Sequence, residues 1–435
     1  MTPHAVLAFW AGGGLLAVLL LFFAIRAGRR LRFLLDTPTS KAKGVFIGQV
    51  ELAGQATIDQ PVCTFLAATA AVWFHYEIEE EWERWETETT RDSKGNTQTR
   101  QVRKTGWNTI DQGGEAPPFF VQDDTGAVLI RPEGADVEPV EVFSQTVGRG
   151  DSLYFGKGPA HEISDSNHRR RFVERAIPVQ AVLFVAGRAR ERSDVVAPEI
   201  AKDKEQELFL ISCRGEAKVQ RGYRIGFWLL GFLALLPLPS AGLIIAKQNG
   251  VNPDWRVLGG AAGGVAVLWG FSWLWMTFNS LVQLRNRVAQ AWSLIDVQLK
   301  RRADLIPRLV NVVTGLRDHE NRVQTEVAAL RTQSTATVPG EPGADVASAG
   351  ATLVSVVERY PELKANDAFL RLQRELSDTE TRIALSRDYY NEIATYQNTR
   401  LEIVPDRWIA PVAGLKARSL LAVESFERAA VTVKM

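Results

Sequence analysis

The stretch Ala5–Ile25, AVLAFWAGGGLLAVLLLFFAI, contains no Asp, Glu, Lys or Arg. Two more uncharged apolar stretches follow, at Ile225–Ala246 and at Val257–Thr277. A helix of about 20 residues crosses the ~30 Å hydrocarbon layer of a bilayer, and a charged side chain at that depth is costly. The sequence therefore predicts a multi-domain α+β membrane protein with three transmembrane helices and two folded domains.

Basic residues at one end of each stretch set the expected orientation, because cytoplasmic flanks of membrane helices carry an excess of Lys and Arg. We expect residues 1–4 and the loop 247–255 outside the cytoplasm, and the domains at 36–217 and 279–435 inside it. A cleaved signal peptide is the alternative for the first stretch, but Met1–His4 lacks the basic residues of such a peptide. The basic flanks are Arg26, Arg29, Arg30 and Arg32; Lys218, Arg221 and Arg224; and Arg285 and Arg287.

Four glycines of the third stretch form two overlapping G-x-x-x-G pairs, Gly259 with Gly263 and Gly260 with Gly264. Small residues let transmembrane helices approach closely. We expect these glycines to pack against the second membrane helix, which its two prolines should bend. Packing between copies of the chain is the alternative.

The net charge of +1 provides no field that would attract nucleic acid, so the expected partners are the lipid bilayer and other proteins. Cys63 and Cys213 are expected to be free and buried in a reducing cytoplasm. His161-Glu162 begins like a zinc-protease helix, but Asp165 stands where the second His is required. We therefore predict no metal site, no bound cofactor and no nucleic-acid binding.

Residues 36–217 have short alternating runs typical of β-strands, separated by Gly and Pro. This pattern favours a β sandwich or a partly open barrel. The sequence DDTG at Asp123–Gly126 predicts a hairpin between two of the strands. The expected strands are Val45–Ala53, Val72–Glu80, Phe119–Gln122, Ala127–Arg131, Val179–Ala186 and Leu208–Ser212.

A polar insertion at Thr89–Glu115 is rich in Thr, Gln, Gly and Arg, and we expect it to form a mobile loop. Just before it, Trp82 and Trp85 lie among several glutamates. We interpret this cluster as an exposed strand end, with a partner-docking edge as the alternative.

Several runs of the middle domain resemble the GIDE domain in sequence and in order. They are DTPTSK at 36–41, the glycine-flanked strand at 48–54, Val72–Glu80, PFF at 118–120, DDTG at 123–126 and the closing run at 174–187. Eukaryotic relatives with this domain are mitochondrial ubiquitin ligases whose chemistry lies in a separate RING module. A RING holds each of its two zinc ions with four Cys or His ligands, whereas this chain has two Cys, five His and no C-x-x-C pair. The resemblance therefore does not imply ubiquitin-ligase activity.

Residues 279–435 have apolar positions every three or four residues, which predicts an antiparallel bundle of about four helices. We expect the third membrane helix to continue into this bundle, with a kink or a new helix start near Asp304 because Pro307 lacks a backbone N–H. Other expected elements are a flexible loop at 334–350, a helix at Leu353–Tyr360, a long helix from Asn366 to Pro405, and a short helix at Ala413–Ala430.

Nearly all of this C-terminal region resembles the LemA family. The motifs are NSLVQLRNRV at 279–288, AWS at 291–293, IDVQLKRR at 295–302, DLIP at 304–307, ERYPELKAN at 358–366, YN at 390–391 and YQN at 396–398. The family implies a membrane-anchored helical bundle without established enzymatic activity. For this chain we expect the inner (plasma) membrane of a bacterium. Relatives in the family often occur in genomic neighbourhoods with membrane proteases, and the resemblance therefore implies a role in envelope quality control.

Polar, aromatic and proline residues of these motifs are the candidate interaction or structural positions. We expect them to cap helices and to pair between helices, and an active cluster is the alternative. No catalytic residue is identified, because no activated nucleophile, glycine-rich phosphate loop or metal set accompanies them. The candidates are Trp292, Asp296, Arg301, Arg302, Asp304, Pro307, Tyr360, Pro361, Asn366, Glu375, Glu380, Tyr390 and Asn391, with Gly259, Gly260, Gly263 and Gly264 for membrane packing.

Two binding-type domains without a catalytic constellation favour a non-enzymatic scaffold or assembly protein that associates with itself or with other membrane proteins. One alternative is an enzyme acting on membrane proteins, or the regulatory subunit of a membrane protease. Another is a module that binds lipid or senses membrane stress, because the basic segments Arg26–Arg32 and Lys41–Lys43 would attract anionic lipid.

Overall fold

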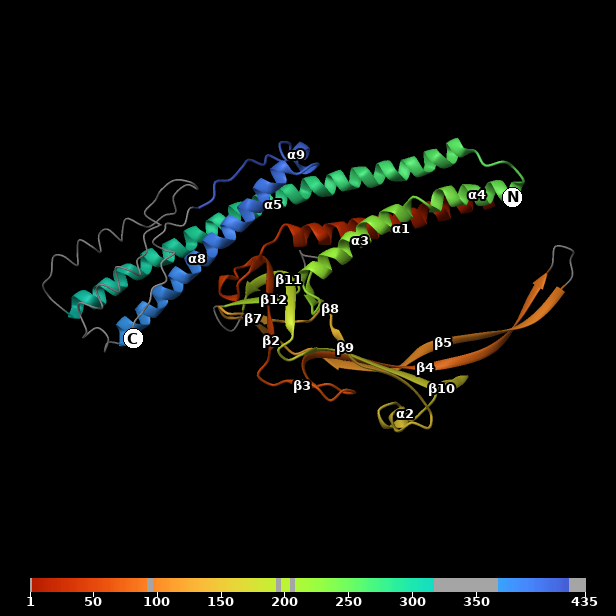
Figure 1. Ribbon diagram of the computed structural model, residues 1–435, viewed down its shortest axis with the longest axis horizontal. Helices are drawn as coiled ribbons and strands as arrows, with labels where there is room; N and C mark the ends of the chain where they lie inside the picture. The colour runs from red at the N-terminus through yellow and green to blue at the C-terminus, as the bar shows by residue number, and fades with distance from the viewer. Residues whose placement is uncertain (1, 92–96, 193–196, 204–207, 317–366, 422–435) are drawn as a thin grey trace. The chain divides into compact units, whose positions relative to one another are not determined.

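The computed structural model describes residues 2–91, 97–192, 197–203, 208–316 and 367–421. It divides into two compact units, Thr39–Val219 and the combination of Met1–Pro38 with Gln220–Met435. The first unit consists mainly of strands and is called the β unit. The second contains the long helices and is called the helical unit (Figure 1).

The helical unit contains three helical segments that are long and apolar enough to cross a membrane, as predicted. Helix α1 spans Pro3–Leu35, with Thr2 as its N-cap. The second segment comprises α3, Glu216–Ala234, and α4, Pro237–Asn249. Its prolines break the helix rather than merely bending it, because a proline cannot donate a backbone hydrogen bond.

Helix α5 spans Trp255–Leu316 and continues without a break from the third candidate membrane span into the C-terminal region, as predicted. Pro307 lies inside it, so the expected new helix start near Asp304 is wrong. The loss of one backbone hydrogen bond at a proline is insufficient to end this helix, whose apolar periodicity continues on both sides.

The four glycines of the G-x-x-x-G pairs do not pack against another described helix. A Cβ atom added at any of them would meet no atom within 4 Å, so the expected contact with the second membrane helix is wrong. They lie on an exposed face of α5, whereas Leu258 and Val265 on another face are buried. Other glycines allow close approach, such as Gly231 beneath Trp269 and Gly242 beneath Leu258.

Helix α8, Asp367–Glu402, packs antiparallel to the C-terminal half of α5, and the short helix α9, Asp406–Ile409, follows it (Figure 1). The antiparallel arrangement agrees with the prediction for this pair. The other helices predicted for the bundle cannot be compared, because the loop at 334–350, the helix Leu353–Tyr360, Pro361 and Asn366 lie outside the described residues. The core shared by α5 and α8 contains Leu284, Val288, Ile295, Leu299, Ile383 and Ile393.

The helix predicted at Ala413–Ala430 is wrong over its described part. Residues 411–414 form a turn, and residues 415–421 are irregular. Gly414 has a φ of +67°, a left-handed conformation that favours glycine and interrupts helical winding.

Five strands of the β unit close into a barrel in the order β2-β6-β7-β12-β11, because β11 also pairs with β2. The sequence favoured a sandwich or a partly open barrel, whereas these five strands form a closed barrel. The predicted hairpin joins β6 to β7. A second sheet has the order β3-β4-β10-β9, with β5 also on β4. The strands are β1 Thr39–Ser40, β2 Gly48–Thr57, β3 Val62–Cys63, β4 Ala70–Arg91, β5 Thr97–Glu115, β6 Phe119–Gln122, β7 Ala127–Ile130, β8 Asp136–Glu138, β9 Val140–Gly148, β10 Ser166–Pro178, β11 Val182–Glu191, β12 Pro198–Ala201 and β13 Leu210–Ser212; a 3-10 turn spans Ala42–Gly44 and helix α2 spans Ser152–Gly156.

The segment Thr89–Glu115, expected to be a mobile loop, is mostly strand. β5 pairs with β4 along its whole length and forms a long two-stranded ribbon (Figure 1). Its polar composition reflects largely solvent-exposed faces joined by cross-strand pairs, which stabilise sheets. Glu83 lies 2.8 Å from Arg103, and Glu86 lies 2.6 Å from Lys104.

Trp82 and Trp85 lie within this ribbon and not at the end of a strand, so that interpretation is wrong. An added Cβ at Gly106 of β5 would lie 2.8 Å from the Trp82 ring, and Trp85 is 60% exposed. The partner-docking edge stays a prediction.

Both cysteines are free as expected, but Cys63 is exposed. Partial burial raises the pKa of the Cys213 thiol to about 11.

Candidate functional site

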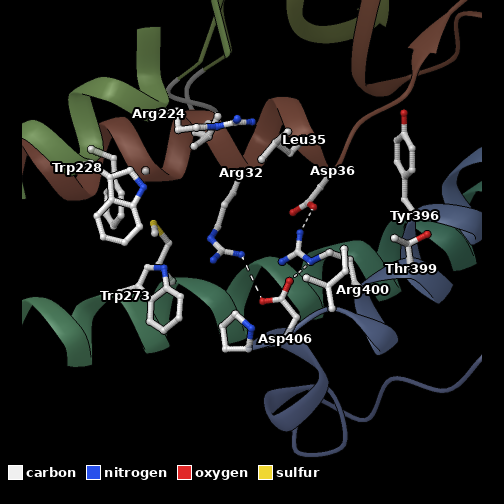
Figure 2. A pocket seen from close by; sticks show the side chains of 16 residues that line it. Arg32, Leu35, Asp36, Arg224, Trp228, Trp273, Tyr396, Thr399, Arg400 and Asp406 are labelled. Carbon is white, nitrogen blue, oxygen red and sulfur yellow. Dashed lines mark hydrogen bonds and ion pairs between the residues drawn. The ribbon is translucent and has the colours of Figure 1, made fainter. Parts of the chain in front are cut away.

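The candidate site lies in the helical unit, where the C-terminal end of α1 meets α5, α8 and α9 (Figure 2). Asp36 is the C-cap residue of α1, and its backbone N–H donates to the carbonyl of Arg32. Asp406 is the first residue of α9, a position where the helix dipole favours a carboxylate. Arg400 belongs to the last turn of α8. We call Arg32, Asp36, Arg400 and Asp406 the charged cluster.

Ion pairs hold the cluster together. The Arg400 guanidinium pairs with the carboxylates of both Asp36 and Asp406, and Figure 2 shows it between them. Arg32 lies 4.0 Å from the Asp406 carboxylate and donates a 2.8 Å hydrogen bond to the hydroxyl of Thr277 in α5.

Two more residues of α5 bind the end of α1. The hydroxyl of Ser280 donates to the Asp36 carboxylate, and Arg287 donates to the Asp36 backbone carbonyl at 2.9 Å. A carboxylate at a helix C-terminus opposes the helix dipole, and these cationic and hydroxyl donors compensate for it.

The acids of the cluster are almost completely buried, with Asp36 4% and Asp406 6% exposed. Burial raises the pKa of Asp36, while the neighbouring Arg400 guanidinium acts in the opposite direction. Removing one partner from a buried charged group costs stability, because the remaining charge is then less well compensated. The cluster therefore makes a specific joint between the end of α1, helix α5 and the end of α8.

A pocket of about 400 Å³ lies beside the cluster (Figure 2). Its lining includes the apolar side chains Phe227, Trp228, Trp273 and Met276. Arg224 of α3 also lines it, is exposed, and makes no hydrogen bond or ion pair with any residue that the structure describes. The pocket thus combines an apolar wall with an available cation. Across the described part of the chain, no group of three or more His, Cys, Asp and Glu residues could hold a metal ion.

Most described sequence-predicted positions lie along the α5–α8 pair, away from the cluster. Trp292 contacts Tyr390 with ring centroids 5.3 Å apart. Arg302 lies 3.7 Å from Glu380, and its side chain is 1% exposed. The structure does not bring the predicted positions into one cluster. Glu375 pairs with Arg371 at 3.9 Å, Asp296, Arg301 and Asp304 are exposed, and Asn391 binds the segment after α9.

Sequence reasoning did not single out the charged cluster. Arg32 was interpreted as a topology signal and Asp36 as the start of the middle domain, while Arg400 and Asp406 matched no motif. A pair between Asp36 and Arg400 joins positions separated by 364 residues, and no local pattern indicates such a contact. The only local signal is an Asp immediately after a basic helix end.

Two family models match separate regions of the chain. Residues 291–435 match the model of the LemA family, and residues 86–237 match the GIDE family, described as E3 Ubiquitin ligase. Protein LemA of Metamycoplasma hominis is 28% identical over 128 residues, covering 28% of this chain and 58% of the relative. Magnetosome proteins MamQ 1 and MamQ 2 of Paramagnetospirillum magneticum are each 24% identical over 173 residues, covering 33% of this chain and 64% of the relative. The matches thus span about six tenths of the relatives' own lengths.

Proposed function

We propose that this chain, which joins a GIDE-like region to a C-terminal LemA-like region, is a non-enzymatic scaffold or assembly protein of a membrane. Its LemA-type helices associate with a second copy or with another membrane protein. We place both folded regions at the cytoplasmic face of a bacterial inner membrane, where envelope quality control is the process we favour. A membrane protease is one partner class consistent with this role.

One observation carries the proposal. Helix α5 runs for 62 residues from a candidate membrane span to its packing against α8, and the charged cluster fixes the end of α8 to the end of α1. A helix pair fixed in this way is presented as a rigid extension of the membrane helices. Rigid placement of a binding surface lowers the entropy lost when a partner binds.

The ubiquitin-ligase description of the matched GIDE family does not transfer to this chain in our proposal. RING chemistry requires two zinc ions with four ligands each, and the sequence contains two Cys and five His. Purified full-length protein should therefore not discharge ubiquitin from a charged conjugating enzyme. Discharge that depends on this chain would contradict that part of the proposal.

The scaffold proposal is tested by co-expressing two differently tagged full-length copies and purifying through one tag in mild detergent. We expect the second tag, or a reproducible membrane-protein partner, to co-purify. A strictly monomeric chain without a partner would contradict the scaffold. Protease activity that co-purifies and is lost in Glu375→Gln or Glu380→Gln variants that keep their fold would favour the enzyme-subunit alternative.

The pocket favours a second candidate function, binding of an anionic phospholipid. Its apolar wall suits an acyl chain, and Arg224 supplies a cation for the headgroup. Native mass spectrometry of the full chain from nanodiscs containing phosphatidylglycerol should show bound lipid that decreases in Arg224→Gln. Arg221→Gln is the matched control, because Arg221 is also exposed on α3 and does not line the pocket. Equal retention of lipid by both variants would contradict this function.

A further inference from the structure

The surface of the chain changes character where α8 ends. Among the described residues of α8, every exposed side chain is polar or Ala. Four large apolar side chains are then exposed within residues 403–412: Ile403 is 49%, Val404 56%, Trp408 70% and Val412 77% exposed. A single exposed apolar residue needs no explanation, but four in one short segment do. We call residues 403–412 the apolar turn.

One side of the apolar turn packs on α5 beside the end of a candidate membrane span. Ala410 and Ala413 are almost completely buried in a core with Leu281 of α5. The third apolar stretch ends at Thr277, and Leu281 lies about one helical turn beyond it, ~6 Å along the axis. The apolar turn is therefore held at the level where the candidate span ends.

An apolar pocket of about 330 Å³ connects the two surfaces. It is lined by Phe271, Leu274, Trp275 and Phe278 of α5 and by Ile409 of α9. Phe271 and Trp275 are 65% and 58% exposed, and Phe271 lies ~9 Å before the end of the apolar stretch. The apolar surface of the turn thus continues onto the outer surface of the candidate span.

The opposite side of the apolar turn is also apolar. The Ala413 N–H donates to the Ile409 carbonyl at 3.1 Å, the i,i+4 bond of helical winding. Trp408 and Val412 are likewise four residues apart and share one side of this winding, whereas Ala410 between them is fully buried. The turn therefore has one apolar side packed on α5 and a second apolar side that is exposed.

We propose that the apolar turn is an interfacial membrane anchor. Trp408 and Val412 insert into the boundary between the headgroups and the acyl chains of the leaflet where the third span ends. Trp is enriched at this boundary, and apolar faces that lie in it are buried by ~5–10 Å. Lipid is the occupant because the exposed side belongs to a segment whose surface continues onto the span.

The charges that flank the apolar turn suit an anionic leaflet. The next charged residues after it, Lys416 and Arg418, are basic and exposed, against one exposed acid, Glu402, before it. Basic residues beside a bilayer attract anionic lipid.

The anchor goes beyond the proposed scaffold, because it adds a contact that holds the end of α8 to the bilayer. It is also separate from lipid binding in the pocket at Arg224, since neither Trp408 nor Val412 lines that pocket.

The test places one spin label at a time on the full chain in nanodiscs that contain phosphatidylglycerol, with Cys63→Ala and Cys213→Ala. The labelled variants are Val267→Cys, Val412→Cys and Val297→Cys, at valines that are 72%, 77% and 58% exposed. Val267 lies at the centre of the third apolar stretch, and Val297 lies ~30 Å beyond its end along α5. Collisions of each label with oxygen, which partitions into lipid, are compared with collisions with a water-soluble nickel chelate.

We expect the ratio of oxygen to nickel collisions to fall in the order 267, 412, 297. A ratio at 412 equal to that at 297 would overturn the anchor. Shielding of position 412 from both reagents would also overturn it, because protein, such as a second copy, would then cover the turn. A water-like label at 267 would overturn the membrane placement of α5 together with the anchor.

A second substitution separates insertion from folding, because Trp408 is mostly exposed and its replacement unpacks no core. Trp408→Asp places a charge at the interface and should lower the ratio at 412 to the value at 297, whereas Trp408→Phe keeps an apolar ring and should preserve it. Ser419→Asp is the matched control, because it adds the same charge at an exposed position outside the apolar turn. Equal ratios at 412 in Trp408→Asp and Ser419→Asp would overturn the anchor.

Discussion

Two buried charge clusters in this chain have the same chemistry and different structural roles. In the β unit, Glu80 of β4 and Arg170 of β10 lie 3.1 Å apart with fully buried side chains, and the sheet already places them opposite each other. In the helical unit, Asp36, Arg400 and Asp406 join the ends of three helices that no sheet holds together. Backbone pairing sets the geometry in the first case, whereas in the second the ion pairs themselves specify how the elements meet.

The largest effect is expected from breaking the β-unit pair. Arg170 also donates to the backbone carbonyls of Tyr154, Pro159 and His161, at 2.7, 2.8 and 2.8 Å. Arg170→Met would leave the Glu80 carboxylate buried without its cation and lower the free energy of unfolding by about 3–5 kcal/mol. The loss is measured in the full chain as a fall in the thermal unfolding midpoint of the β unit. Limited proteolysis at increasing temperature reports that midpoint.

The neighbouring Arg169 provides the control, because its side chain is 54% exposed and its partner Glu81 lies 3.0 Å away. Arg169→Met should cost less than about 1 kcal/mol, as exposed ion pairs do. Equal destabilisation by the two variants would mean that burial does not determine the strength of these pairs.

A smaller and more local effect is expected in the helical unit. Arg400→Met should cost about 1.5–3 kcal/mol, the range for a hydrogen bond to a charged group, because Arg32 and Arg287 still neutralise the acids. Amide hydrogen exchange should accelerate in the last turns of α8 and in α9, and the β unit should be unchanged. Arg407→Met is the control, since Arg407 is exposed on α9. Unchanged amide hydrogen exchange in α8 and α9 of Arg400→Met would contradict the role of the charged cluster in holding these helix ends.

Glu199 is a third buried carboxylate, and its arginine partners are partly exposed. The dependence of stability on pH tests its contribution. Glu199 of β12 is 3% exposed and accepts bonds from Arg131 and Arg190, at 2.7 and 2.8 Å. Burial alone would raise the pKa of Glu199, but the hydrogen bonds from the two arginines outweigh burial and lower it. A lowered pKa in the folded state contributes stability above the unfolded pKa of about 4.3, and that stability is lost as the pH falls through the folded value.

Glu199→Gln should therefore flatten the acid-induced fall in stability below about pH 4.3. The difference from the unaltered chain should stay below about 1 kcal/mol, because both arginines are partly exposed. Thermal unfolding midpoints of both chains at a series of pH values from neutral to acidic measure it. Parallel curves would show that the two arginines do not stabilise the ionised form.

The elements that follow from local pattern could be predicted from the sequence. Each of the three apolar stretches lies inside an observed helical segment that is longer than the stretch. The predicted strands Phe119–Gln122 and Ala127–Arg131 agree with the observed bounds to within one residue. The part of the β4–β5 ribbon beyond the predicted strand Val72–Glu80 was not predicted, because strands that expose polar residues on both sides lack an alternating apolar signal. Its order comes from cross-strand pairing, which a single-segment pattern does not contain.

The candidate site was less predictable because it depends on contacts between distant positions. Arg400 and Asp36 acquire their role only when the end of α8 reaches the end of α1. The resemblance to the LemA family singled out Asn391 and the YQN motif, but their contacts with residues 416–421 require the chain to turn back after α9. Sequence pattern identified these residues of α8 but not the segment of the same chain that they contact.

The most direct test of the joint at the charged cluster is a distance measurement between α1 and α8. Spin labels at Arg29→Cys and Asp388→Cys, both exposed positions, can be placed in the full chain with Cys63→Ala and Cys213→Ala, and measured by double electron–electron resonance in nanodiscs. We expect one narrow distance distribution that broadens in Arg400→Met and stays narrow in Arg407→Met. A broad distribution in the chain with Arg400 intact, or a narrow one that survives Arg400→Met, would contradict the joint.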